Sequence, residues 1–301
     1  MAGTATATQR ELLALEAKVL ASAGDGWLNS IDEIRRDLAN EDVDTRKQVL
    51  ALIAPKIEAG AKLAVADAFN IGRASALSII KGQRVGDKIL KAANSKAAKA
   101  GPSARAVGTL DGLDARNAEA LDLARKLLAA GAELDAVCTP LFAAANSTRA
   151  SVTSSINMSG NDATTLVADA ADLPTVWVAE TDACVECLAY SGLAADPGDL
   201  FPGGLSYDKS YNDEDLEAPP LHPNCRCTVE PLGDPSYAEA LRREADRSVL
   251  RGFSLESEGM ATRIRAAKKL IEGGVDAPKS VIDYAKKSVK KGEFATRGRP
   301  S

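Results

Sequence analysis

The sequence predicts a mainly α-helical protein with a helical N-terminal region, a small α+β insert and a basic helical C-terminal tail. Alanine is abundant, whereas aromatic residues make up only 4% of the 301 residues, and this composition favours close-packed helices over β-sandwiches. Apolar side chains recur at helical spacing over most of the chain. Between residues 174 and 235 the periodicity changes, and β-branched residues, prolines and cysteines gather there. We therefore divide the chain into residues 1–173, 174–235 and 236–301.

The N-terminal region begins with a sequence typical of a helix start. Residues Thr8–Glu11 form a capping box ahead of apolar positions that run to Leu20, and Gly24 and Gly26 end that helix. A second box at Ser30–Glu33 predicts a short helix through Leu38. A third helix is expected from Thr45, and Pro55 either kinks it or begins the next helix.

Longer helices follow in the same region. Apolar periodicity predicts helices over residues 61–80, 114–130 and 133–156. Residues 95–112 are rich in Ala, Lys, Gly and Ser, and we expect a mobile linker or loop there. Cys138 lies in a helical pattern, so we interpret it as a small buried apolar residue.

The insert carries two strand patterns and one short helix. Thr175–Ala179 is β-branched around Trp177, which we expect in the core, and residues 226–230 form the second strand. Asp182 can cap a helix that Gly192 ends, and residues 194–220 have the composition of a loop. Such a unit can bury little apolar surface, so a bound metal would explain how it stays folded.

Four of the five cysteines and the only histidine supply the candidate ligands, and they form C-x-x-C followed by H-x-x-C-x-C. The five residues are Cys184, Cys187, His222, Cys225 and Cys227. Thiolate and imidazole ligands favour zinc, and two separated clusters can close a tetrahedral structural Zn²⁺ site. Five candidates exceed four positions, so one is spare or supporting.

Local geometry supports this grouping. Cys184 and Cys187 are three residues apart on a helix and face the same way, whereas Cys225 and Cys227 share one face of a strand. A tight turn at Pro223–Asn224 would bring His222 beside Cys225. Arg226 is either exposed or neutralises nearby acids. Coincidental cysteines in a loop-rich segment are the alternative.

A catalytic metal is the weaker interpretation. The deaminase pattern is absent because Asn224 stands two residues after His222. The H-E-x-x-H, G-x-S-x-G and phosphate-loop motifs are also absent. We therefore expect no enzymatic activity. An open zinc position beside a carboxylate such as Glu186 would favour a metal-dependent enzyme instead.

Charge is distributed unevenly. Residues 176–240 hold 13 acids and 2 bases, and residues 241–301 hold 15 bases and 8 acids. An acidic insert would be repelled by phosphates, which argues against a DNA-reading zinc finger. If nucleic acid is bound, the 241–301 tail binds it; otherwise the tail is solvated or docks on an acidic protein surface. Two basic helices are expected there, over residues 257–271 and 280–291, before a disordered end at 296–301.

No apolar run reaches the length needed to span a bilayer, and the first residues lack an apolar signal core. We therefore expect no membrane partner and a reducing compartment, where clustered cysteines bind metal more often than they form disulfides.

The segment from Trp177 through the D-x-x-C-x-x-C helix to P-P-x-H-P-N-C-R-C resembles the phage Mu protein F-like minor head, or head morphogenesis, family. The residues that carry the resemblance are Trp177, Asp182, Cys184, Cys187, Gly192, Pro219, Pro220, His222, Pro223, Asn224, Cys225, Arg226 and Cys227. The match covers 50 to 80 residues, including the preceding helix over residues 146–159. Neither the N-terminal helices nor the basic tail belongs to it.

The resemblance implies a structural virion protein that is made in the bacterial host cytoplasm and located in the phage head. It implies a minor capsid role in assembly and in DNA packaging or ejection. The expected partners are the portal protein and the major capsid or scaffold protein, with packaged double-stranded DNA as a partner of the tail. The alternatives are a metal-dependent phage-borne enzyme or effector, and a zinc-stabilised adaptor unrelated to phage.

Overall fold

The computed structural model describes residues 6–22, 35–36, 38–52, 56–83, 85–180, 183–203, 215–250, 260–273 and 275–294. Its helices are α1 (Ala7–Ser22), α3 (Val43–Leu52), α4 (Glu58–Gly82), α5 (Asp87–Ala100), α6 (Ala104–Gly108), α7 (Leu113–Ala129), α8 (Leu134–Ala170), α9 (Val185–Tyr190), α10 (Pro235–Leu250), α11 (Met260–Glu272) and α12 (Lys279–Lys291). Its strands are β1 (Thr175–Val178), β2 (Ala194–Ala195) and β3 (Thr228–Pro231). The expected mainly helical fold with a small α+β insert is confirmed.

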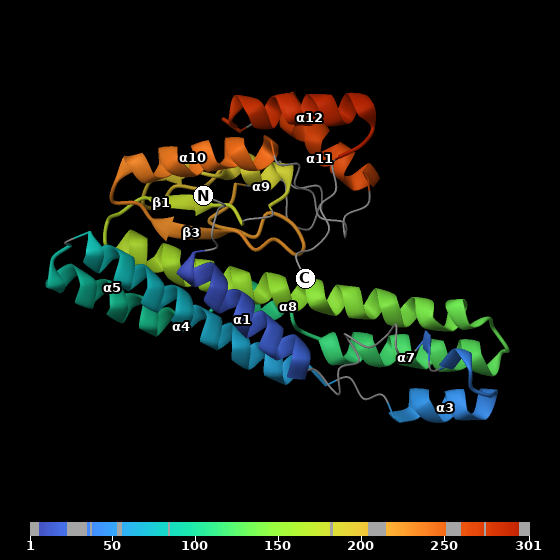
Figure 1. Cartoon of the computed structure of the whole chain (residues 1–301). Helices are drawn as coiled ribbons and strands as arrows, with labels where there is room; N and C mark the ends of the chain where they lie inside the picture. The colour runs from blue at the N-terminus through green and yellow to red at the C-terminus, as the bar shows by residue number, and fades with distance from the viewer. Residues whose placement is uncertain are drawn as a thin grey trace.

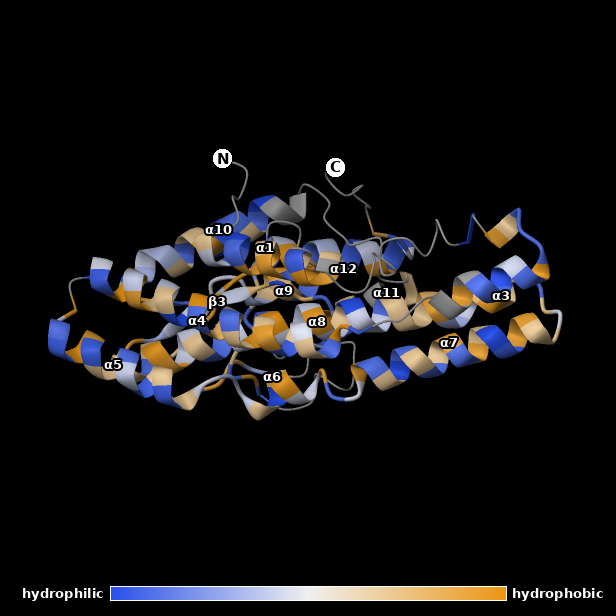
Figure 2. Cartoon of the chain, turned by 90° about the horizontal axis from the view of Figure 1, so that it is seen from below, coloured by the Kyte–Doolittle hydropathy of each residue, from blue (hydrophilic) through white to orange (hydrophobic). Residues whose placement is uncertain are grey.

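The molecule has two layers that share one long helix. Figure 1 shows α8 running along the molecule, with α4, α5, α1 and α7 on one side and the sheet with the C-terminal helices on the other. In Figure 2, orange and blue alternate along α4, α5 and α7, as expected for helices with one apolar face. Because both layers pack on α8, residues 152–161 of this helix are buried on all sides.

The α8 helix crosses α4 at very close range. A Cβ atom on Gly72 of α4 would lie 1.9 Å from the Gly160 carbonyl oxygen of α8. The Ser159 hydroxyl donates to the Val65 carbonyl at 2.7 Å beside this crossing. Glycine is therefore required at position 72 because it alone lets the two backbones touch.

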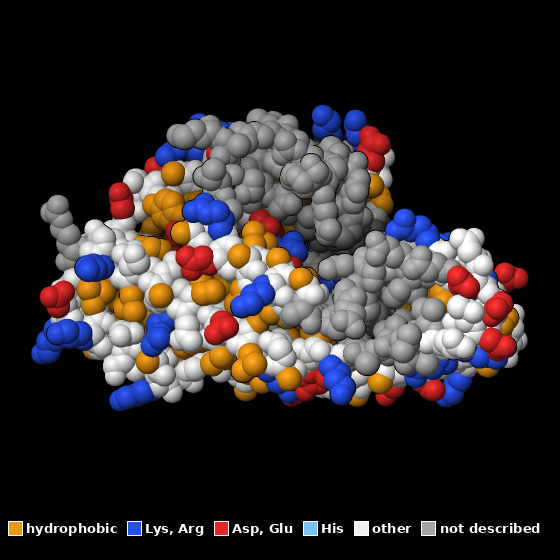
Figure 3. All heavy atoms as spheres, turned by 60° about the horizontal axis from the view of Figure 1, so that its bottom comes forward, with side chains coloured by type: hydrophobic (Ala, Val, Ile, Leu, Met, Phe, Trp, Pro, Cys, Tyr) orange, Lys and Arg blue, Asp and Glu red, His pale blue; other side chains and the backbone are white. Residues whose placement is uncertain are grey.

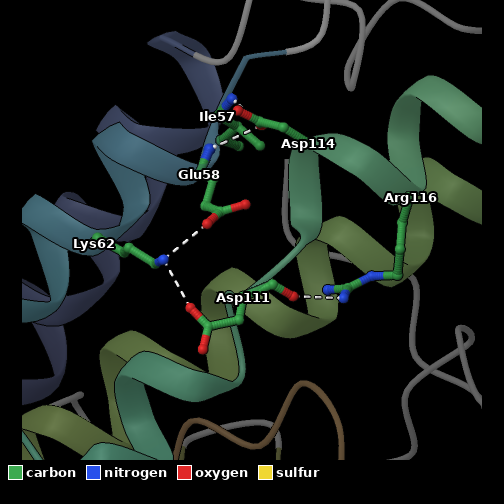
Figure 4. Close-up of polar contacts among 6 residues, drawn as sticks. All are labelled: Ile57, Glu58, Lys62, Asp111, Asp114 and Arg116. Atoms are coloured by element: carbon green, nitrogen blue, oxygen red, sulfur yellow. Dashed lines mark hydrogen bonds and ion pairs between the residues drawn. The ribbon is translucent and has the colours of Figure 1, made fainter.

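The start of α4 is capped from outside its own helix. The Asp114 carboxylate of α7 accepts hydrogen bonds from the backbone N–H groups of Ile57 and Glu58 at 2.8 and 3.0 Å (Figure 4). Lys62 forms ion pairs with Glu58 and Asp111, each at 2.7 Å. The Asp114 carboxylate thus supplies the capping acceptor that the N-cap residue Ile57 cannot provide.

A three-stranded antiparallel sheet in the order β2-β1-β3 forms the base of the insert. Trp177 points to one side of β1, where its ring centroid lies 4.7 Å from that of Tyr190 and 5.4 Å from that of Phe201. Val176 and Val178 point to the other side, against α10. The expected core position of Trp177 is confirmed, whereas β2 falls where we expected only loop.

The expectation that the insert would bury little apolar surface is wrong. Trp177 and Tyr190 are fully buried in a cluster that also contains Leu270 of α11 and Val281 of α12. Residues from the expected tail therefore complete the core of the insert. A sequence window over 174–235 could not reveal these partners because they come from later in the chain.

The expected linker at residues 95–112 is also wrong. Most of it is helical, in α5 and α6, and Ala97 and Ala106 are buried. Alanine and lysine are strong helix formers, and this local preference prevails over the loop-like composition. The α8 helix runs to Ala170 rather than ending near Ile156, because its polar residues there face the insert and do not terminate the helix.

The remaining helices lie close to their predicted ranges. We expected a capping box at Thr8–Glu11, but it forms at Thr6 and Gln9, where each side chain bonds the other's backbone N–H at 3.0 and 3.2 Å. Cys138 is buried, as expected. The predictions for Gly24, Gly26, Ser30, Pro55 and residues 296–301 fall outside the described part of the chain. The prediction that Asp182 caps the helix of the insert is wrong, because Cys184 is the N-cap of α9.

Within the described residues, α4 is long and apolar enough to cross a membrane by length and composition alone. Core helices of globular proteins share this length and composition. Here the apolar side of α4, including Val65 and Phe69, is buried within the protein, and α4 packs against α8 and α1.

The close helix crossing yields a stability prediction. Gly72→Ala should lower the free energy of unfolding by about 2–3 kcal/mol, because the new methyl group overlaps the Gly160 carbonyl and the helices must separate. Thermal or urea unfolding measures this change.

The matched control is Gly60→Ala in the same helix, where a Cβ meets nothing within 4 Å. This change should leave stability unchanged or raise it by about 0.5–1 kcal/mol. Equal effects of the two substitutions would show that the two helices do not cross at position 72.

Candidate metal centre

The five candidate ligands come together from two parts of the chain that are more than 30 residues apart. Cys184 and Cys187 lie at the start of α9, whereas His222, Cys225 and Cys227 lie in the loop before β3. Two groups of three donors form, in each of which the ligand atoms lie within 4.8 Å of one another. Cys184, Cys187 and His222 form one group, Cys187, Cys225 and Cys227 form the other, and Cys187 belongs to both.

The start of α9 orients the first two sulfurs. Cys184 is the N-cap of α9, and its Sγ accepts a hydrogen bond from the Cys187 N–H at 3.5 Å. Gly192, with a φ of +78°, follows the helix end, as the sequence predicted. A Cβ at Gly192 would meet the Ala238 carbonyl of α10 at 2.4 Å. The helix therefore has a fixed start and a fixed exit.

A tight turn places the histidine, as predicted. Asn224 has a φ of +60°, and the Cys225 N–H donates to the His222 carbonyl at 3.1 Å. The His222 Nδ1 lies 2.8 Å from the Pro223 carbonyl oxygen. Because a carbonyl only accepts, Nδ1 carries the proton, and Nε2, which faces the Cys184 and Cys187 sulfurs, can offer its lone pair to a metal.

We expected Cys225 and Cys227 to lie on a strand, and this expectation is wrong. The strand β3 begins at Thr228, so both cysteines precede it. The loop conformation still brings the Cys225 Sγ to 3.7 Å from the Cys187 Sγ. Hydrogen bonds from side chains of other elements, and not the alternation of a strand, therefore hold this loop in position.

The Cys187–Cys225 distance matches that between two ligands of one tetrahedral ion, and three donors at a time lie within 4.8 Å of one another. Metal–sulfur bonds of about 2.3 Å at tetrahedral angles separate two sulfurs by about 3.8 Å, and the Cys187–Cys225 separation is 3.7 Å. The His222 Nε2 lies 3.0 Å from the Cys184 Sγ and 3.1 Å from the Cys187 Sγ. The residues present can therefore hold a metal ion.

The electrostatics of the cluster also call for a cation. Burial raises the pKa of the Cys184 thiol, but its hydrogen bond to Cys187 and the nearby His222 outweigh this and bring the pKa well below that of a free thiol. Hydrogen bonds to Cys184, Cys225 and Cys227 hold the pKa of Cys187 well above that value. Neighbouring buried thiols cannot all ionise together unless a bound cation compensates their charge.

Access to the cluster is restricted. All five donor residues are buried, with exposed fractions between 1% and 4%, and Glu186 between the first two cysteines is also buried. An ion held there would be shielded from bulk water. Such shielding is compatible with a closed structural site, in which four protein ligands fill the coordination sphere.

Sequence reasoning missed Asn161, which ties the metal loop to α8. Its amide nitrogen donates to the Cys227 carbonyl at 3.1 Å and the Pro219 carbonyl at 3.3 Å, and its amide oxygen accepts from the Val229 N–H at 3.0 Å. Asn157 orients the amide through a 2.9 Å bond. A buried polar run in α8 was the available signal, but nothing in the sequence indicated its partners.

Arg226 pairs with an acid that the sequence did not suggest. Its guanidinium makes two hydrogen bonds, at 3.0 and 2.8 Å, to the carboxylate of Glu16 on α1. Gln9 of the same helix donates to the Val178 carbonyl of β1 at 3.3 Å. The neutralising interpretation of Arg226 is confirmed, and the pair joins the N-terminal helix to the loop that carries Cys225 and Cys227.

No family model, curated protein or solved structure matches this chain.

The Asn161 bridge generates a prediction. Asn161→Leu should lower the free energy of unfolding by about 2–5 kcal/mol, because the Cys227 carbonyl and the Val229 N–H lose their partner inside the protein. Chemical unfolding measures this, and Asn94→Leu on the exposed side of α5 is the control, with an expected effect within about 0.5 kcal/mol. A loss below 1 kcal/mol for Asn161→Leu would contradict the bridging role.

The Glu16–Arg226 pair generates a second prediction about this region. In a double-mutant cycle, Glu16→Gln and Arg226→Gln should show a coupling energy of about 1–2 kcal/mol, since the pair is bidentate and Glu16 is buried. Amide hydrogen exchange should become faster in α1 of each single variant. Glu11→Gln, an exposed position of the same helix, should change neither measurement, and a coupling energy near zero would disprove the link.

Proposed function

We propose that this chain is a minor capsid, or head morphogenesis, protein of a tailed phage, with a structural Zn²⁺ in its insert. The observation that carries the proposal is the meeting of the two halves of the C-x-x-C and H-P-N-C-R-C motif in one buried cluster. These are the residues on which the resemblance to the Mu protein F-like family rests. The packing of Trp177 beside that cluster is consistent with it.

The role we propose is structural and without catalysis. Zinc would be held by Cys184, Cys187 and His222, with the fourth position filled by Cys225 or Cys227, and it would keep α9 and the loop before β3 in one arrangement. The burial of all five donors supports a closed site. A metal-dependent enzyme or effector would need an open position that water or substrate can reach.

The partners that we propose follow the layers of the fold. The N-terminal helices would dock on the portal protein or on the major capsid or scaffold protein. The 241–301 tail would meet packaged double-stranded DNA. The protein would thus be made in the host cytoplasm and located in the phage head.

Particle composition tests the role. In purified phage heads, quantitative mass spectrometry should find this protein at a low, defined copy number, and it should copurify with the portal protein from procapsids. Its consistent absence from procapsids and mature particles would overturn the proposed role and favour an adaptor unrelated to phage.

Metal analysis tests the centre. The natively purified protein should contain about one equivalent of zinc, and Cys184→Ser should lower this content severalfold and reduce thermal stability, because one ligand of the closed site is lost. Cys138→Ser is the matched control, since Cys138 is also buried but lies on α8 outside the cluster. Full zinc content and unchanged stability in Cys184→Ser would disprove the assigned ligand.

A further inference from the structure

One face of α12 presents a row of lysines to solvent. Lys279, Lys286 and Lys290 are spaced by seven and four residues, so they fall on one line along the helix. Lys287 lies beside this line, and all four are exposed. We call these four residues the α12 lysine row. Asp283 is the one acidic residue of α12 and lies on the same face. The four lysines and this aspartate together give the face a net charge of +3.

Within the described part of the protein, the lysines of this row form no ion pair. The neighbouring Lys291 does so, with Glu293 at 3.7 Å. Together α11 and α12 contain nine bases and two acids. The row is thus a local positive surface on a chain whose net charge is −5, and local charge governs contact with a polyanion at short range.

The opposite face of α12 is already used in folding. Val281 and Ala285 are fully buried, and they belong to the core cluster that contains Trp177 and the metal-site cysteines. Amphipathic helices that bind membranes insert their apolar face among lipids. Because that face of α12 is covered by protein, α12 cannot insert among lipids in this way.

The row is long enough to meet several phosphates of one duplex. Its outer lysines, Lys279 and Lys290, lie about 16 Å apart along the helix, and duplex DNA carries one charge about every 1.7 Å of its axis. The row contains no aromatic residue on which an unpaired base could stack. Its lysines can reach guanine, but the row contains no Arg, Asn or Gln to read base edges alongside them.

We propose that the α12 lysine row is a contact surface for the phosphate backbone of double-stranded DNA, without sequence preference. This inference deepens the proposed role of the tail and rests on that role for the source of the DNA. The surface is presented rigidly, since α12 is fastened to the core of the insert.

Another helix has similar charge but a different arrangement. Helix α5 carries Lys88, Lys91, Lys96 and Lys99, all exposed, but only Lys88 and Lys99 share a line, three turns apart. The end of α5 also borders a cavity lined by Asp162, Asp169, Asp199 and Glu217. In Figure 3, which shows the underside of the molecule, basic and acidic side chains are interspersed. Helix α5 is therefore a matched control for the row.

The test uses the full-length, metal-loaded protein and a fluorescent 30-base-pair duplex of random sequence, with anisotropy measured over a range of salt concentrations. The triple variant K279Q/K286Q/K290Q should bind roughly 100-fold more weakly at 0.1 M salt. It should also reduce the slope of log affinity against log salt by about 2.7, since each phosphate contact contributes about 0.9. The charge-preserving variant K279R/K286R/K290R should retain wild-type affinity within about threefold.

The α5 variant K88Q/K91Q/K99Q removes the same charge and should change affinity less than about threefold. Equal losses in the two glutamine variants would overturn the proposal. So would tighter binding to single-stranded DNA, displacement of the duplex by polyglutamate at equal charge concentration, or no binding at 20 mM salt. Zinc content and circular dichroism confirm that each variant is folded, and particle composition separately tests the proposed role.

Discussion

Two adjacent residues of α8 hold the two layers of this protein together. Gly160 lets the backbone of α4 approach until no Cβ at Gly72 could fit. Asn161 forms hydrogen bonds with Cys227 in the loop that carries two candidate ligands and with Val229 in β3. Since each residue of α8 at this point faces a partner, the position of the metal cluster relative to the bundle is set by one rigid helix. Displacing α8 would disturb the bundle and the cluster together.

The metal cluster is built on this frame and is also braced from the other end of the chain. Arg226 lies between two candidate ligands in the sequence. Its pairing with Glu16 fixes the ligand loop relative to α1. The Trp177 core beneath α9 includes residues of α11 and α12. The insert therefore has its own apolar core. A bound ion would order the ligand loops and would not be needed to compensate for the lack of a core. This is a narrower role for the metal than the sequence suggested.

The proposed function makes physical sense of the division of charge. The acidic insert would repel DNA, whereas α12 turns lysines outward while its apolar face remains in the core. A protein that must sit against other proteins and against DNA needs such separated surfaces, because one mixed surface would weaken both contacts. Under this proposal the bundle side, where charges are interspersed, would face the protein partners.

Local pattern in the sequence was sufficient for most of the helices, for β1 and for the five candidate ligands, because helical periodicity and the C-x-x-C and H-x-x-C-x-C spacings depend only on neighbouring residues. It also placed Gly192 after α9 and the turn at Asn224. It could not reveal the bridge from Asn161, the partner of Arg226 or the core residues that α11 and α12 supply, and it misjudged residues 95–112. The Asn161–Cys227 and Arg226–Glu16 bonds join residues 66 and 210 positions apart. Such pairs are chosen by packing in three dimensions, where burial of polar groups demands partners that no local pattern specifies.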